Sequence, residues 1–166
     1  MDDLPAIYYN LVKKIKNENN CKMMTKGFHK DVKIIYIYGP SGSGKSFNAI
    51  EIMKQHNYEN FENVKHNKSD FWLGVNEGEG CCLYDDFRDS DMKANEFINF
   101  IDYNIHTMNI KGGCVPNKYS LIIITSIKSP YQLYDKMKEE EKKQWLRRMI
   151  IYECQNLELT LIEPDI

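Results

Sequence analysis

The stretch GPSGSGKS, Gly39 to Ser46, constrains this chain more than any other part of its sequence. It fits the pattern GxxxxGK[ST] in full, follows the apolar run IIYIY and precedes a segment with helical spacing of apolar residues. In such a strand, loop and helix, the glycines let backbone N–H groups surround phosphate oxygens, and the helix presents the positive end of its dipole. The sequence therefore predicts a phosphate loop that binds a nucleoside triphosphate.

The residues of this loop have expected places around the nucleotide. The Lys45 ammonium should reach the β- and γ-phosphates, and the Ser46 hydroxyl should bind Mg²⁺. The predicted nucleotide-binding set is Gly39, Pro40, Ser41, Gly42, Ser43, Gly44, Lys45, Ser46 and Phe47. ATP and Mg²⁺ are the expected cofactors.

A pair of acidic residues follows a second apolar run, in CCLYDDF. Because ligands of α/β folds gather beyond the carboxyl ends of the strands, Asp85 is expected to hold Mg²⁺, directly or through water. Asp86 projects differently and could polarise the attacking water as a general base. The alternative is that the pair only caps the next helix.

Compact apolar runs alternate with amphipathic segments along the rest of the chain. The predicted strands are Lys33–Tyr38, Gly80–Tyr84 and Ser120–Thr125, with two short strands in the tail that starts at Ile150. The predicted helices are Lys45–Gln55, Met92–Tyr103 and Lys138–Met149. This interleaving indicates an α/β fold with a central, mainly parallel sheet, as in P-loop NTPases.

The N-terminal residues follow a separate pattern. Apolar side chains recur with the spacing of an amphipathic helix at Leu4, Ile7, Tyr8, Leu11, Val12 and Ile15. This stripe could pack on the main domain or on a neighbouring subunit, and a polar linker follows it. We therefore expect a small helical segment and linker at residues 1–30 and the P-loop domain at 31–166, a division that a length of 166 residues permits.

Composition limits the partners and the cellular compartment expected for the chain. With 22 basic and 24 acidic residues, its net charge of −2 gives no global electrostatic case for nucleic-acid binding, so any such binding must come from a local cluster or from a patch repeated around an oligomer. No apolar run is long enough to span a bilayer. Cys81 and Cys82 fall in a predicted strand and are expected to be small core residues, one on each face, which favours a reducing compartment.

The segment KGGCVPNK contains two adjacent glycines between strand-like runs and predicts a hairpin that carries Lys111 at its tip. Such a basic hairpin could contact nucleic-acid phosphate, although on its own such a segment is more often an ordinary solvated turn.

The segment QWLRRM places Arg147 and Arg148 at the end of a charged helix. They could form surface ion pairs with nearby carboxylates. Alternatively, in a ring of ATPases, one of them could act as an arginine finger on the nucleotide of the next subunit.

The order of these motifs resembles the superfamily 3 helicase domain of replication-initiator (Rep) proteins of circular single-stranded DNA viruses, most closely those of circoviruses and cycloviruses. The likeness covers roughly residues 32–152 and includes the phosphate loop, FWLGVNEGEG, CCLYDDF, KGGCVPNKYSLIIITS, KSPYQLY and QWLRRM. It implies that Gly39 to Ser46 form the Walker A motif and that Asp85 and Asp86 form the Walker B pair.

The resemblance also implies roles for the later motifs. Lys111, Gly112 and Lys118 would contact single-stranded DNA from a pore loop, and Arg147 or Arg148 would be the finger. The chain would form a ring, a hexamer by this resemblance, and act in rolling-circle replication in the host nucleus. The N-terminal segment would resemble the small oligomerisation domain of the family.

Two positions depart from the family pattern. Ile127 stands where relatives usually carry the asparagine of motif C, so the role of sensing the γ-phosphate must fall to Ser126 or Thr125. Leu73 replaces an acidic residue that commonly follows the tryptophan, so Trp72 is expected to serve in packing. The scattered histidines offer no metal-binding pair, and we expect no nicking activity in this chain.

The leading hypothesis is therefore an ATP-driven DNA helicase domain that hydrolyses ATP at subunit interfaces. Two alternatives remain open: a small P-loop kinase of a metabolite or nucleotide, and a non-catalytic ATP-binding assembly module. The kinase would transfer phosphate to a small acceptor without stimulation by DNA, and the assembly module would bind ATP with negligible turnover.

Overall fold

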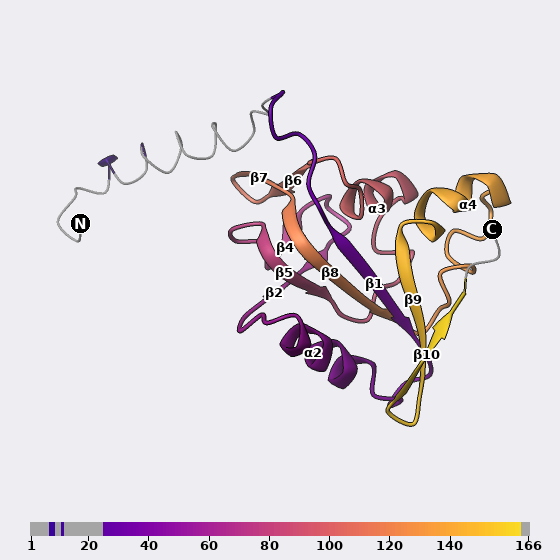
Figure 1. Cartoon of the computed structure of the whole chain (residues 1–166). Coiled ribbons are helices and arrows are strands. Elements are labelled where there is room, and N and C mark those ends of the chain that lie inside the picture. The colour runs from indigo at the N-terminus through magenta and orange to yellow at the C-terminus, as the bar shows by residue number, and fades with distance from the viewer. Residues whose placement is uncertain (1–6, 9–10, 12–24, 164–166) are drawn as a thin grey trace.

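A six-stranded sheet forms the centre of the protein in the computed structural model, which describes residues 7–8, 11 and 25–163 (Figure 1). Its strand order is β10-β9-β1-β8-β5-β2, and only β10 runs antiparallel to its neighbour. The strands are β1 (Lys33–Tyr38), β2 (Glu62–Asn63), β5 (Glu79–Tyr84), β8 (Lys118–Ser126), β9 (Met149–Gln155) and β10 (Glu158–Ile162). The predicted mainly parallel α/β fold is confirmed.

Helices cover both faces of the sheet. Helix α2 (Lys45–Gln55) packs on one face, where Ala49, Ile52 and Met53 join Ile35 and Ile37 in one apolar core. Helices α3 (Ala94–Phe100) and α4 (Glu139–Leu146) pack with the alternate strand residues, such as Tyr36, in a second core. The continuous apolar runs of β1 and β8 are the result of this double coverage.

The cysteines of β5 follow the expected alternation. Cys81 belongs to the core under α2 and Cys82 to the core on the opposite face, and both are buried free thiols, as is Cys154. Cys114 is disulfide-bonded.

Two hairpins extend from the sheet. Strands β3 (Lys65–His66) and β4 (Trp72–Leu73) form one of them, in which Trp72 is 2% exposed and stacks near Phe100, so its predicted packing role is confirmed. Strands β6 (Thr107–Ile110) and β7 (Gly113–Pro116) form the predicted basic hairpin. Gly112, at its tip, has φ of +89°, a conformation that favours glycine.

Helices α3 and α4 are shorter than the sequence pattern predicted. Met149 pairs with Ile34 as the first residue of β9, which ends the helical segment before it. After Phe100 the chain turns towards β6 instead of continuing α3 to Tyr103. At the end of α4, strand pairing has therefore overridden helical periodicity.

Most of the predicted N-terminal helix lies outside the described residues. Ile7, Tyr8 and Leu11 are helical and exposed. The end of the linker pairs with the segment before β6: the Ile105 N–H donates to the Phe28 carbonyl (2.7 Å). The boundary near residue 30 stays a prediction. Within the described residues, none of the helices combines the length and apolar character needed to cross a membrane.

Candidate functional site

Three neighbouring parallel strands bring the predicted motifs to one edge of the sheet. The phosphate loop follows β1, the acidic pair follows β5, and β8 ends between them at Thr125 and Ser126. Tyr38 is the register partner of Ser126, and Tyr84 is that of Ile124, so the three carboxyl ends lie level with one another. This edge is where α/β folds bind ligands.

Hydrogen bonds join the three motifs directly. The Ser46 hydroxyl donates to Oδ1 of Asp85 (2.8 Å), and the Thr125 hydroxyl donates to the same oxygen (2.6 Å). The Asp86 N–H in turn donates to Thr125 Oγ1 (2.9 Å). Thr125 therefore fixes both members of the acidic pair.

Asp86 differs from Asp85 in direction and exposure. Its φ of +55° places it in the left-handed region. Its carboxylate lies near Arg88, whereas that of Asp85 accepts from Ser46 and Thr125. Half of the Asp86 side chain is exposed, at 50%, and its partner Arg88, which is 65% exposed, lies 3.5 Å away. Because such exposed pairs are weak, the carboxylate is accessible to water.

The phosphate loop has donors suited to phosphate oxygens. The Lys45 ammonium donates to the carbonyls of Gly39 (2.9 Å) and Pro40 (2.8 Å), across the loop. Ser43 Oγ is buried and has no hydrogen-bond partner among the described residues. Since a buried hydroxyl normally finds a partner, this atom fits a loop that closes around a ligand.

The turn between β9 and β10 packs against the loop, a contact that sequence reasoning missed. The Leu157 N–H donates to the Ser43 carbonyl (2.8 Å), and the Asn48 side-chain amide donates to the carbonyls of Gly44 (2.9 Å) and Leu157 (3.0 Å). Gly44 is needed here, because a Cβ would lie 2.4 Å from Leu157 Cδ2. The C-terminal hairpin therefore holds the loop from one side.

The end of β8 distinguishes the two candidates for the sensing role. The Ser126 hydroxyl donates to the Phe87 carbonyl (2.7 Å) and accepts the Lys128 N–H (3.1 Å), both within the chain's own backbone. Thr125 instead contacts Asp85. The neighbouring Ile127 is 55% exposed and offers no polar group.

The donor set fits Mg²⁺ only in part. Ser46 and Asp85 offer hard oxygen atoms of the kind that Mg²⁺ prefers. The described part of the chain holds no cluster of three or more His, Cys, Asp or Glu side chains that could bind a metal. Phosphate oxygens and water would therefore complete the coordination, as is usual for this ion in nucleotide sites.

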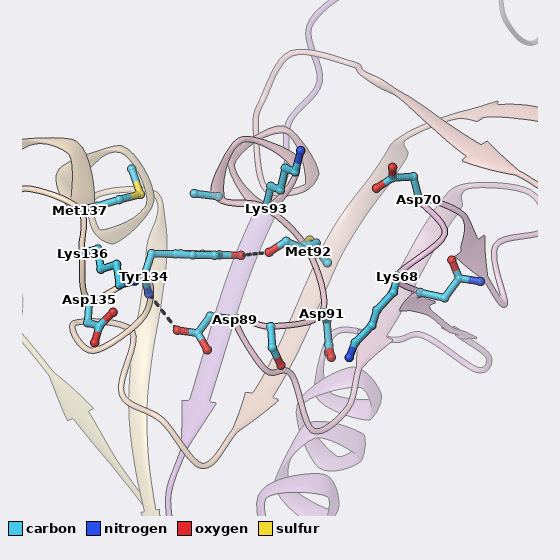
Figure 2. A pocket seen from close by; sticks show the side chains of 13 residues that line it. Lys68, Asp70, Asp89, Asp91, Met92, Lys93, Tyr134, Asp135, Lys136 and Met137 are labelled. Atoms are coloured by element: carbon cyan, nitrogen blue, oxygen red, sulfur yellow. Dashed lines mark hydrogen bonds between the residues drawn. The ribbon is translucent and has the colours of Figure 1, made fainter.

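A cavity of about 620 Å³ opens near this edge, between the loop after β5 and the segment before α4 (Figure 2). Asp89 and Ser90 line both this cavity and a smaller one that includes Asp86. Tyr134 donates its hydroxyl to the Met92 carbonyl (2.9 Å) and its N–H to Asp89 (3.0 Å). Burial alone would raise the pKa of Asp89, but hydrogen bonds from Tyr134 and Lys128 lower it, so this carboxylate stays charged.

The predicted DNA-binding residues lie away from the phosphate loop. The β6–β7 hairpin stands at the opposite end of the sheet from the loop (Figure 1). Lys111 at its tip and Lys118 at the start of β8 are both exposed.

Arg147 and Arg148 also lie at the end of the sheet opposite the phosphate loop, because β9 starts beside the beginning of β1. Neither can reach the nucleotide site of its own chain. Arg148 is 3.5 Å from Asp102, and its side chain is only 20% exposed. Arg147 is exposed and forms no side-chain hydrogen bond or ion pair with the residues that the structure describes.

Comparison with known families agrees with this geometry. Residues 35–128 match the family model described as RNA helicase. The match covers more than half of the chain and includes the phosphate loop, the acidic pair, the β6–β7 hairpin and the end of β8. No curated protein matches the chain.

Proposed function

We propose that this chain, which belongs to the RNA helicase family of superfamily 3-type domains, is the ATP-driven DNA helicase domain of a viral Rep protein. The observation that carries the proposal is the hydrogen-bonded group of Ser46, Asp85 and Thr125 at one edge of the sheet. The Lys111 hairpin at the opposite edge adds a surface for a nucleic-acid strand. A domain of this type couples nucleoside triphosphate hydrolysis to movement on nucleic acid.

Binding of ATP rearranges the loop. The Lys45 ammonium leaves the carbonyls of Gly39 and Pro40 for the phosphates, while the loop N–H groups surround the phosphate oxygens. Ser46 and Asp85 would hold Mg²⁺, which supplies positive charge against the phosphates. Phe47, 58% exposed on the first turn of α2, lies next to this site.

Hydrolysis then depends on the two side chains beyond the metal ligands. Asp86, open to water, accepts a proton from the attacking water. Thr125 senses the γ-phosphate through its bond to Asp85, because Ser126 is bonded to backbone instead. A side chain that holds both acidic residues links the state of the phosphate to the position of the general base.

The arginine finger comes from a neighbouring copy. Arg147 fits this role better than Arg148, because its side chain is exposed whereas that of Arg148 is paired with Asp102. A guanidinium placed against the γ-phosphate neutralises charge that develops in the transition state. Closed rings, with six copies expected from the Rep resemblance, would place one such arginine at each site.

Single-stranded DNA is the proposed track. Copies of Lys111, Gly112 and Lys118 around a ring would make a basic channel although each chain carries a net charge of only −2. This arrangement suits rolling-circle replication in a host nucleus, as the Rep resemblance implies.

Strand displacement tests the proposal. A DNA duplex with a single-stranded tail should be unwound by the parent with ATP and Mg²⁺, and Lys45→Ala should abolish unwinding. Lys54→Ala, on the same helix in an exposed pair with Glu51, should unwind like the parent. No unwinding of tailed DNA, or unwinding of tailed RNA alone, would refute a DNA helicase.

A small-molecule kinase is a second candidate, and the smaller cavity of about 250 Å³ that Asp86 lines is the feature that favours it. A small acceptor in that cavity would lie near the γ-phosphate. Transfer of labelled phosphate from ATP to a small acceptor, without stimulation by DNA, would support the kinase.

A further inference from the structure

Asp102 connects the base of the Lys111 hairpin to the junction that carries the proposed arginine finger. It lies two residues after the end of α3, and its side chain is only 10% exposed. The His106 Nε2–H donates to Asp102 Oδ2 (2.9 Å), and Arg148 Nη1 lies 3.5 Å from Asp102 Oδ1. One carboxylate therefore holds a residue from the base of the hairpin and a residue from the start of β9.

The hairpin is attached to this carboxylate through His106. His106 immediately precedes β6, and its carbonyl accepts the Asn117 N–H (2.8 Å) at the other side of the hairpin base. Asn117 is itself anchored, since its side-chain amide donates to the Phe100 carbonyl (2.9 Å) at the end of α3. A displacement of the hairpin base therefore acts on Asp102 through His106.

The other partner of Asp102 adjoins the proposed finger. Arg147 is the C-cap of α4 and Arg148 precedes β9, so the two arginines share one short junction. Because the Arg148 side chain is mostly buried against Asp102, its position also sets the backbone from which Arg147 projects.

The contact between Asp102 and Arg148 is loose. Arginine–carboxylate hydrogen bonds are usually about 2.7–2.9 Å long. Here Asp102 Oδ1 and Arg148 Nη1 are buried and lack any hydrogen-bond partner within the described ranges. Buried polar atoms of this kind are costly to leave unpaired, so a small shift that closes the contact is favourable.

We propose that Asp102 is a positioning residue that transmits contact of the Lys111 hairpin with single-stranded DNA to Arg147. The proposal rests on the proposed function. When DNA displaces the hairpin, His106 moves Asp102 against Arg148, and the junction turns Arg147 towards the nucleotide of the neighbouring copy. By linkage, the approach of Arg147 to that nucleotide strengthens the grip on DNA to the same degree.

A matched pair of variants at His106 tests the coupling. Replacing Asp102 itself would leave Arg148 buried without a counter-charge and risks unfolding the protein. His106 is more exposed, at 32%. His106→Leu removes the donor to Asp102, whereas His106→Gln keeps an amide nitrogen near the position of Nε2.

The readout is ATPase activity of the full chain with and without a single-stranded DNA oligonucleotide, together with oligonucleotide affinity and the melting temperature. His106→Leu should lose about fivefold or more of the DNA stimulation, while its basal rate and DNA affinity in the absence of nucleotide stay within about twofold of the parent. His106→Gln should keep the stimulation. A purely structural role would not separate stimulation from basal rate and DNA affinity.

Three results would overturn the inference. They are full stimulation in His106→Leu, equal loss in both variants, and a loss of basal rate that matches the loss of stimulation. A parent that DNA does not stimulate would refute the proposed function itself, and the coupling with it.

Discussion

Gly44→Ala tests whether the C-terminal hairpin holds the phosphate loop. Gly44 has φ of +98°, and a Cβ there would lie 2.4 Å from Leu157 Cδ2 and 3.2 Å from Leu157 Cα. Leu157 is 59% exposed and its side chain can rotate, but its Cα cannot move away freely, because the Leu157 backbone is bonded to Ser43 and Asn48. The substitution should therefore strain both the loop and the turn.

Two contributions set the size of the effect. A left-handed backbone costs an alanine about 1–2 kcal/mol, and an added methyl group in a packed contact costs about 1–3 kcal/mol more. Gly42→Ala is the matched control, because Gly42 also has a positive φ, of +76°, but a Cβ there meets nothing within 4 Å. Gly42→Ala should thus lose only the first contribution to the free energy of unfolding.

Urea unfolding without nucleotide measures this difference. Gly44→Ala should be less stable than Gly42→Ala by about 1–3 kcal/mol. Adding Leu157→Ala to Gly44→Ala should recover most of that difference, since it removes the nearest atom, Leu157 Cδ2. Equal stability of the two single variants, or no recovery in the double variant, would refute the packing of the turn on the loop.

Three further predictions concern the catalytic edge, the linker and the subunit interface. Thr125→Val removes the hydroxyl that donates to Asp85. In a steady-state assay at saturating ATP, turnover should fall about 10- to 100-fold, which corresponds to the loss of one hydrogen bond to a charged group. An unchanged rate would contradict the role of Thr125. Burial lowers the pKa of Lys30 to about 8, so between pH 8 and pH 10 the unfolded state binds more protons than the folded state. In denaturant titrations the parent should therefore gain about 2–3 kcal/mol relative to Lys30→Met across this range, and parallel curves would contradict it. Mixing Lys45→Ala with Arg147→Ala chains should restore ATPase activity that neither has alone, because only mixed interfaces combine an intact loop with an intact finger; no recovery would place the finger elsewhere.

Local sequence patterns were enough to predict the strand, loop and helix that form the phosphate-binding part of the site. The phosphate loop, β1 and α2 were predicted with their observed bounds, because loop motif, apolar run and helical spacing agree there. Cys81 and Cys82 face opposite cores, as strand alternation requires.

Contacts between distant segments could not be predicted in this way. The choice between Thr125 and Ser126 depends on which hydroxyl meets Asp85, and β8 is buried on both faces, so its sequence shows no alternation. The packing of Leu157 on Ser43 also depends on the fold, because it joins the tail to the loop. The turn of Asn156 and Leu157, both with positive φ, carries no glycine to mark it in the sequence.

In the proposed mechanism, ATP hydrolysis between neighbouring copies of the chain is coupled to a DNA strand held by the Lys111 hairpin. ATPase activity per chain, measured against protein concentration with and without single-stranded DNA, tests it most directly. Specific activity should rise with concentration, DNA should raise it further, and Lys111→Ala should lose the DNA response. Specific activity that is independent of both concentration and DNA would refute this mechanism.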